Sequence, residues 1–452
     1  MRKPFPTSGD CTTPWYRSWL GIGVIALLSA AWLGYRLEAE PAFVDEWAYF
    51  SQSFYGPLWW EGKWDRVEWL DYAAYDLPPL PKYLIALSLR LDGHPLPGPV
   101  EARAWYGDTS TTFGDLDLLL SARRPSVLFG VLGCLAAFVL GNLARGPGVG
   151  LLAAALLAIN PLYRMHARRA MSDVPAEALV LVALAVGLWA WREILIGQRP
   201  VASWFALAFG AGTLSGLAVL SKLNGGLALM VLGAWGGLAV VLPGFSRKRK
   251  AALLGSLSAA GVVAFAVFLV GNPFLSARPR AAPPESRRLA DQTILERTEV
   301  VLEHRVSVSR TAQNLFPHNA LTSLAEKVKV VAVQGFGRFG PLGPRATDSR
   351  IRYDGSQDWG ALIWGPIVAC GLVWSALLGR RQLREGRPPT AWAVGLQAVV
   401  ALLTVTMFIP LAWDRYLLPI QSGSALLAAG AIVAVGEWLS RRRLPIKRVE
   451  AS

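Results

Sequence analysis

Charged residues are scarce in this 452-residue chain, where they make up 17% of the sequence, against roughly 25% in a typical soluble domain. Hydrophobic residues reach 53% and the mean hydropathy is +0.37. A water-soluble fold of this size would carry more charge, so the composition favours an integral membrane protein.

Cysteine and histidine are also few, which limits disulfide and metal chemistry. The three cysteines lack CxxC spacing and the four histidines lack metal-ligand spacing, so neither a disulfide framework nor a His-rich zinc site is expected. The sequence has no His-Glu-x-x-His motif, phosphate-binding glycine loop or Gly-x-Ser-x-Gly elbow. These absences argue against zinc proteases, P-loop proteins and serine hydrolases.

Long apolar runs, in contrast, are abundant. A transmembrane helix needs roughly 20 mainly apolar residues, and about ten segments qualify or nearly qualify. We therefore predict an all-α polytopic membrane protein, whose first helix is too long to be a usual signal-peptide core. The predicted spans are residues 19–35, 125–143, 147–163, 174–191, 201–220, 223–242, 251–270, 359–378, 392–411 and 416–438.

The net charge of +14 comes from basic clusters between the apolar runs rather than from a nucleic-acid-binding motif, so no nucleic-acid partner is expected. The positive-inside rule places these clusters, and both termini, in the cytoplasm of a cell carrying the protein in its plasma membrane. The predicted organisation is a membrane domain over residues 1–440, two long extracytoplasmic loops at 36–124 and 272–358, and a basic cytoplasmic tail at 441–452.

The two outer loops have different sequence character. The first is rich in aromatic residues such as Trp47, Trp59 and Trp69, which predicts a structure lying at the lipid interface. The second contains Ser323 followed three residues later by Glu326, a capping-box pattern that predicts the start of a short helix.

Candidate functional residues gather at the outer ends of the predicted helices. Ionisable residues are nearly absent from the middle of the spans, whereas a transport path usually requires them there. Each outer group alone fits a solvated or salt-bridged helix end, but together they offer a base and several cations for an anionic substrate. The groups are Asp45-Glu46, Pro78 to Lys82, Arg164 to Asp173, Ser221 to Asn224, and Asp414 to Tyr416.

These segments, in this order, resemble the GT-C superfamily of membrane glycosyltransferases, and within it glycosyltransferase family 39, which includes protein O-mannosyltransferases and lipid A aminoarabinose transferases. Leu77 and Pro81 replace a more usual polar residue and glycine, and the large lumenal domains of the eukaryotic protein mannosyltransferases are absent. The matching stretches are Asp45-Glu46, Pro78-Pro79-Leu80-Pro81-Lys82, Arg124-Pro125-Ser126, Asn160-Pro161, His166 to Asp173, Gly216 to Lys222, and Arg415 to Pro419.

The resemblance implies a GT-C-type helical bundle that transfers a sugar from a polyprenyl-phosphate donor to a hydroxyl acceptor, with inversion at the anomeric carbon. Asp45 would be the general base, and Glu46 would support it or orient the acceptor. Asp173 would orient a cation or the donor sugar. The cations expected to bind the donor phosphate are Lys82, Arg168, Lys222 and Arg415.

Three questions remain open at this point. A Mg²⁺ or Mn²⁺ ion held by Asp45 and Glu46 could assist the cations, and the acceptor could be a lipid, a glycan or a protein in or near the bilayer. The alternative functions are a lipid flippase or transporter, a non-catalytic scaffold, and an oligosaccharide- or polysaccharide-processing transferase of the same superfold.

Overall fold

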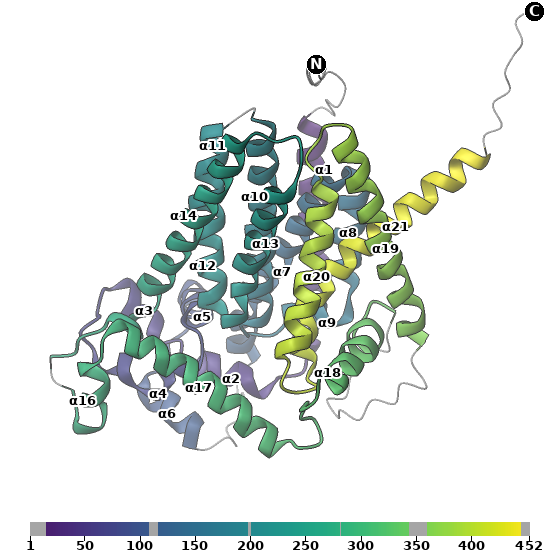
Figure 1. Ribbon diagram of the computed structural model, residues 1–452. Helices are drawn as coiled ribbons and strands as arrows, with labels where there is room; N and C mark the ends of the chain where they lie inside the picture. Colours follow the sequence, from purple (N-terminus) through teal and green to yellow (C-terminus); the bar gives the residue numbers. More distant parts are fainter. Residues whose placement is uncertain (1–14, 108–115, 198–199, 281, 343–358, 444–452) are drawn as a thin grey trace, which may run out of the picture.

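The computed structural model describes residues 15–107, 116–197, 200–280, 282–342 and 359–443. Within these residues the regular structure is helical, apart from one isolated β-bridge between Ala320 and Leu411. Long helices form a bundle, and short helices form a layer across one end of it (Figure 1). The all-α prediction is confirmed.

Eight helical segments of the described chain are long and apolar enough to cross a membrane. Helices α8 and α9, bent by 68° at their junction, make a ninth if counted as one span, and the apolar part of α1 is shorter. The ten predicted spans fall on these helices, which confirms a multi-pass membrane protein. The bundle contains α1 (Trp15–Gly34), α7 (Leu116–Ala144), α8 (Pro147–Ile159), α9 (Pro161–Ala167), α10 (Asp173–Ile196), α11 (Pro200–Phe205), η3 (Ala206–Ala211), α12 (Gly212–Ser221), η4 (Leu223–Gly226), α13 (Leu227–Val241), α14 (Arg247–Gly271), α19 (Trp359–Arg384), α20 (Thr390–Phe408), η7 (Asp414–Leu417) and α21 (Leu418–Arg443).

Small residues let the bundle helices approach one another closely. A Cβ atom added at Gly141 of α7 would lie 2.8 Å from the Cα of Gly150 in α8, and one added at Gly371 of α19 would lie 2.3 Å from the carbonyl oxygen of Leu427 in α21. Lipid tails give helices little hydrophobic reason to associate, so such close backbone contact is a main source of their packing energy.

The layer of short helices comes from two distant parts of the chain. Its core contains Tyr55 and Trp69 from the first part and Phe274 from the second. Trp69 of the first loop is therefore buried inside this layer, and the position of the layer at the lipid interface stays a prediction. The layer contains η1 (Leu37–Ala39), α2 (Val44–Ser51), α3 (Tyr55–Trp60), η2 (Val67–Leu70), α4 (Tyr72–Asp76), α5 (Pro79–Leu91), α6 (Pro99–Gly107), α15 (Pro273–Ser276), α16 (Pro284–Asp291), α17 (Ile294–Leu315), α18 (Leu324–Val330) and η5 (Val331–Arg338).

Two local predictions can be compared with the structure. The capping box is confirmed, because the Ser323 hydroxyl accepts from the Glu326 N–H and the Glu326 carboxylate accepts from the Ser323 N–H at the start of α18. The second span differs, since α7 begins at Leu116 and carries Pro125 inside it. Neighbouring helices can satisfy the carbonyl that such a proline leaves free.

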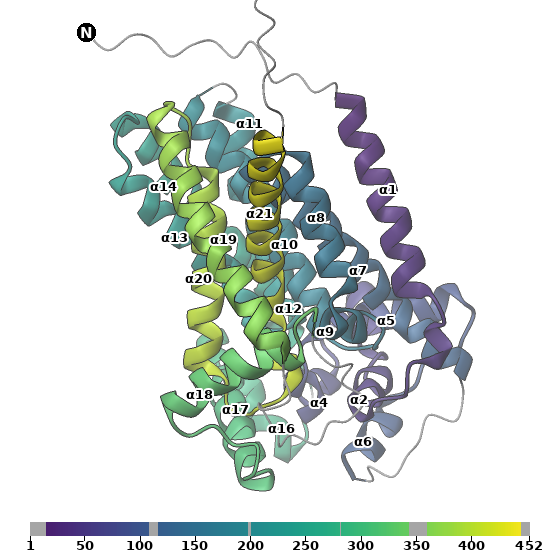
Figure 2. The same cartoon turned by 90° about the vertical axis from the view of Figure 1, so that its right-hand side faces the viewer.

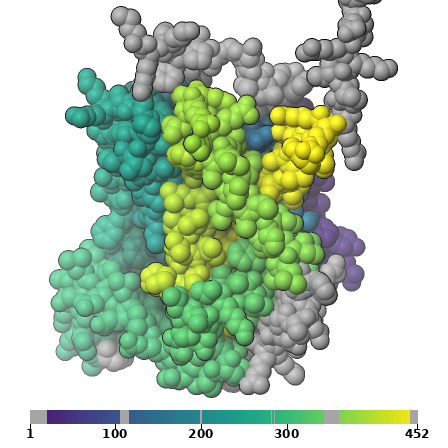
Figure 3. Space-filling model, turned by 45° about the vertical axis from the view of Figure 1, so that its right-hand side comes forward, coloured from purple at the N-terminus to yellow at the C-terminus, as the bar shows by residue number. Residues whose placement is uncertain are grey.

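The first helix starts and the last helix ends on one side of the bundle, opposite the layer of short helices (Figure 2). The green segment that includes α16 to α18 forms a continuous mass beneath α20 (Figure 3). The two ends of the bundle therefore differ: one carries helix-to-helix turns, and the other carries a folded layer.

Candidate active site

Asp45 and Arg415 meet where the short-helix layer joins the bundle. Asp45 lies in the first turn of α2, and Arg415 lies in η7, immediately before α21. Their side chains form an ion pair across 370 positions of sequence, with Arg415 23% and Asp45 31% exposed. The Arg415 guanidinium also lies 4.7 Å from the ring centroid of Trp413. Two predicted site residues are thus in direct contact and still reachable from outside.

A second ion pair lies beside the first. Lys222 Nζ donates to Asp173 Oδ1 at 2.6 Å, and the Asp173 side chain is almost fully buried. Lys222 follows the last residue of α12 in extended backbone, which turns its side chain toward the first residue of α10. Lys222 also lies 5.7 Å from the ring centroid of Tyr416. Four predicted residues, Asp45, Asp173, Lys222 and Arg415, therefore form one cluster of alternating charge.

His166 borders this cluster from α9. The bend between α8 and α9 falls at Asn160-Pro161, where the Asn160 side chain accepts from the Tyr163 N–H at 2.9 Å. This bend brings His166 Nε2 to 3.7 Å from Asp414 Oδ1. The Asp414 carboxylate also accepts a hydrogen bond from the backbone N–H of Arg415 at 2.6 Å. His166 thus lies beside the turn that carries Arg415.

Glu46, in contrast, is fully engaged in the fold. Arg123 of α7 donates two hydrogen bonds of 2.8 Å to it, and both side chains are fully buried. The backbone N–H groups of Ala170 and Phe43 supply two more, at 2.8 and 2.9 Å. A carboxylate has about four acceptor positions, so Glu46 has none left for an acceptor or a metal ion, and it positions α2.

Lys82 and Arg168 also lie outside the cluster. Lys82 is buried, donates to the carbonyl of Ala73 at 2.6 Å, and its burial lowers the pKa of its ammonium group to about 7. Arg168 donates to the carbonyls of Tyr35 and Arg36, just after α1, and pairs with Glu40 at 3.4 Å. Both cations hold backbone in place, which their sequence motifs did not indicate.

The donor set fits a divalent ion poorly. Within the described ranges no group of three or more His, Cys, Asp or Glu side chains comes together as metal ligands. Glu46 has no free acceptor position, and Asp45 already pairs with Arg415.

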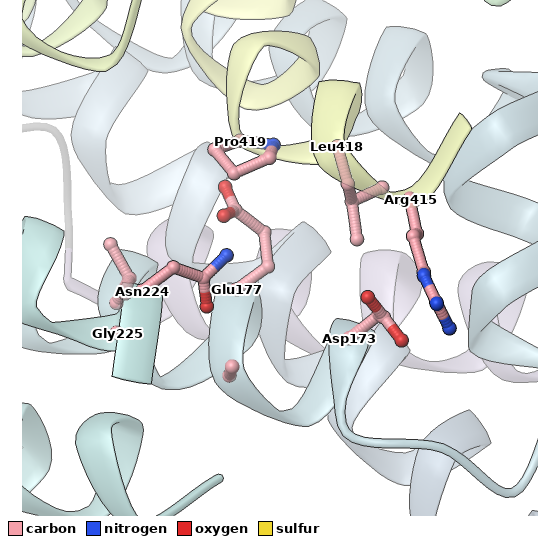
Figure 4. Close-up of a pocket in the computed structure, with 9 residues that line it drawn as sticks. Asp173, Glu177, Asn224, Gly225, Arg415, Leu418 and Pro419 are labelled. Atoms are coloured by element: carbon pink, nitrogen blue, oxygen red, sulfur yellow. The ribbon is translucent and has the colours of Figure 1, made fainter. Parts of the chain in front are cut away.

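A small pocket lies beside the cluster. Asp173 and Arg415 line one end of it, and Glu177 and Asn224 lie at the other (Figure 4). Glu177 lines this pocket and was not among the residues predicted from the sequence. The available signal was its position four residues after Asp173, which places both carboxylates on one face of α10, inside an otherwise apolar run.

The structure thus combines a bundle of long apolar helices with a cluster of two ion pairs at one end of it. The family model described as dolichyl-phosphate-mannose-protein mannosyltransferase matches residues 64–274, just under half of the chain. No curated protein sequence matches the chain significantly. The family match and the structural neighbours confirm the resemblance to GT-C glycosyltransferases of family 39.

Solved structures share the fold at low sequence identity. The oligosaccharyltransferase of Archaeoglobus fulgidus, tethered to an acceptor peptide, matches with a TM-score of 0.53 and 17% identity, over 96% of this chain and 51% of that one. ArnT from Cupriavidus metallidurans, bound to undecaprenyl phosphate, matches with a TM-score of 0.52 and 17% identity, over 96% and 63%. The chain thus spans about half to two thirds of the length of these proteins.

Proposed function

We propose that the protein is an inverting membrane glycosyltransferase that moves one sugar from a polyprenyl-phosphate donor to a hydroxyl acceptor. The observation that carries the proposal is the cluster of Asp45, Arg415, Lys222 and Asp173, which offers a reachable carboxylate beside two cations at the end of the membrane helices. The family match concerns mannosyltransferases that use dolichyl phosphate mannose, and the neighbouring ArnT structure holds undecaprenyl phosphate.

The donor phosphate would bind to Arg415 and Lys222. Arg can hold a phosphate through its planar fork and Lys as a point charge. Because Arg415 now pairs with Asp45, binding of the phosphate would draw the guanidinium away and free the Asp45 carboxylate. Asp173 keeps Lys222 in place. Of the four cations expected to bind phosphate, Lys82 and Arg168 support the surrounding backbone instead.

The freed Asp45 carboxylate would take the proton of the acceptor hydroxyl at a distance of about 2.6 to 3.2 Å. The acceptor oxygen would form a bond to the anomeric carbon from the face opposite the phosphate, which inverts the configuration. The bond between that carbon and the phosphate oxygen would break, and the polyprenyl phosphate would leave with the electron pair. Arg415 and Lys222 would stabilise the charge that develops on the leaving phosphate.

The orientation of the site supports a reaction on the extracytoplasmic face. Basic residues lie in the turn between α7 and α8, in the first turn of α14, and at the end of α19. These helix ends lie at the end of the bundle opposite the layer of short helices (Figure 1). Under the positive-inside rule that end faces the cytoplasm, so the site faces outward. The hydrocarbon tail of the donor would then lie in the bilayer beside the bundle.

The test is a transfer assay with purified protein in proteoliposomes, offered undecaprenyl phosphate carrying mannose, glucose, aminoarabinose or galacturonic acid, with membrane extract as acceptor. We expect turnover of one donor and a loss of about 10²- to 10⁴-fold in Asp45→Asn. The matched control is Asp65→Asn, an exposed carboxylate of the same layer, which should keep wild-type turnover. Wild-type transfer by the Asp45 variant, or lipid movement across the bilayer without transfer, would overturn the proposal.

A further inference from the structure

Arg164 is a cation at the end of the membrane helices that the proposed reaction does not use. It lies in α9, and its guanidinium stacks 4.4 Å from the ring centroid of Trp32 in α1. Its Nε is buried without a hydrogen-bond partner, and within the described chain no carboxylate forms an ion pair with it. A buried guanidinium N–H that lacks an acceptor is costly, so a ligand that brings acceptors would bind here favourably.

The positive charge around Arg164 exceeds the negative charge. Arg168, one turn further along, is held against the end of α1 by hydrogen bonds to two backbone carbonyls. Glu40 is shared between Arg168 and Arg169, at 3.4 and 3.5 Å. Arg36 is exposed directly after α1, and it forms no ion pair within the residues that the structure describes. Two arginines are thus left without a counter-charge where α1 ends.

This group of arginines faces away from the candidate active site. Residues four apart share one face of a helix, so Arg164 and Arg168 both lie on the side of α9 that faces α1. His166, between them, points instead to Asp414 in the turn before α21. An anion bound at Arg164 would therefore occupy a second site, separate from the one proposed for the donor phosphate.

Two exposed apolar stripes run along the membrane helices to the same point. Trp32 donates from its Nε1 to the carbonyl of Ala158 at 3.0 Å, so α1 and α8 lie side by side here, at the edge of the bundle (Figure 2). Residues four apart form a continuous stripe on a helix. The stripes are Val24, Leu28 and Trp32 on α1, and Leu151, Ala155 and Ile159 on α8. Acyl chains that cover these stripes would place a lipid head group beside Arg164.

We propose that Arg164, Arg36 and Trp32 bind the head group of an anionic phospholipid, whose acyl chains lie along the stripes of α1 and α8. The planar fork of Arg164 would donate to the phosphodiester oxygens, and Trp32 suits the level of the head groups. The negative charge of the lipid would balance the two unpaired arginines. This site stands independently of sugar transfer, because it lies on the other side of α9.

The experiment is native mass spectrometry of the full-length protein in detergent, titrated with phosphatidylglycerol or with phosphatidylcholine of the same chain length. We expect phosphatidylglycerol to bind about tenfold more tightly or better, since the positive choline group is repelled by the arginines. Arg164→Gln should weaken phosphatidylglycerol binding by about ten- to hundredfold, as expected for hydrogen bonds to a charged group. It should also narrow the difference between the two lipids, which a purely structural role of Arg164 would not do.

Two further variants separate the site from folding and from general surface charge. Arg36→Gln changes an exposed side chain and should weaken phosphatidylglycerol binding by a smaller factor, even if the Arg164 variant fails to fold. Arg90→Gln is the matched control, because Arg90 also lies over a tryptophan ring, at 5.6 Å from that of Trp60 in the short-helix layer. It should keep the wild-type Kd. An unchanged Kd in the Arg36 and Arg164 variants, or an equal loss in the Arg90 variant, would overturn the site.

Competition identifies the source of the phosphate. Inorganic phosphate should not displace phosphatidylglycerol, because it cannot cover the apolar stripes, and displacement would mean a site for small anions instead. Bare undecaprenyl phosphate should leave phosphatidylglycerol bound. If it displaced the phospholipid with an affinity that depends on Arg164, this would be a donor site and the phospholipid assignment would fail.

Discussion

Two ion pairs begin at neighbouring residues of α2 and end in opposite environments. Glu46 pairs with Arg123 in full burial, and backbone N–H groups take up its remaining acceptor positions. Asp45 pairs with Arg415 at a partly exposed position beside a pocket. The first pair is complete within the protein, whereas in the proposed function the second would exchange its partner for a substrate. A carboxylate with free acceptor positions can act on a ligand, and a saturated one holds the fold.

The neighbouring residues Arg123 and Arg124 repeat this contrast. Arg123 is fully buried and also donates to the carbonyls of Leu37, Glu40 and Pro41, so it binds the segment between α1 and α2. Arg124 points outward and pairs with Asp92, and its own side chain is 61% exposed. Motif position alone therefore does not reveal which of two adjacent charges is structural.

Removing the buried partner should have the largest effect on stability. Arg123→Ala leaves the Glu46 carboxylate buried without its cation, and breaking such a pair typically costs about 3 to 5 kcal/mol. The free energy of unfolding in detergent micelles, measured by denaturant titration, should fall by that amount. Asp45→Asn removes a member of the open pair and should change it by less than about 1 kcal/mol. Equal losses in the two variants would contradict the comparison.

Much of the fold could be predicted from the sequence because long apolar runs identify membrane-spanning helices. The spans at α10, α14 and α20 could be predicted from their own residues, without reference to the helices beside them. The bend between α8 and α9 and the early start of α7 were harder to predict. Both depend on how proline is accommodated by packed neighbours, which a single sequence does not describe.

The candidate site could be predicted only in part, for a related reason. Asp45, Asp173, Lys222 and Arg415 lie at helix ends on one side, so counting helices brings them together. Glu46 was predicted to share the chemistry of Asp45, but side-chain direction on α2 turns it to Arg123. The partner of Lys82 was equally unpredictable. It is the backbone carbonyl of Ala73, and every residue has a backbone carbonyl, so the sequence does not indicate which one is bound.

The pH dependence of the free energy of unfolding extends the comparison of buried and exposed charges to Lys82. Lys82 is buried and donates its hydrogen bond to the carbonyl of Ala73. Burial lowers the pKa of Lys82 to about 7, whereas an unfolded lysine keeps a pKa near 10.4. Between those values the unfolded chain binds more protons than the folded protein, so the free energy of unfolding should rise with pH from about 7 to about 10 and should not change with this group below pH 7. We expect a gain on the order of 2 kcal/mol between pH 7 and 9 that is specific to Lys82.

The measurement is thermal unfolding in detergent from pH 6.5 to 9.5 for the wild type and for Lys82→Met. Methionine is an unbranched side chain of similar length that lacks the amine. The variant should show a flatter stability curve over this window. Lys63→Met, at an exposed position of the same layer, should follow the wild type. Parallel curves for the wild type and the Lys82 variant would mean that the amine stays protonated in the folded protein.

The smallest expected effect comes from the outward half of the arginine pair. Arg124→Ala removes an exposed ion pair with Asp92, and such pairs contribute about 0.2 to 1 kcal/mol. The free energy of unfolding in detergent should therefore fall by no more than about 1 kcal/mol. The loss should be smaller still in 0.5 M salt, because exposed charges are screened. The adjacent Arg123 variant should keep its loss at high salt, since buried pairs are screened much less. A loss at Arg124 as large as that at Arg123 would show that the motif arginine holds the fold from its exposed position, because two adjacent residues would then contribute equally despite their opposite burial.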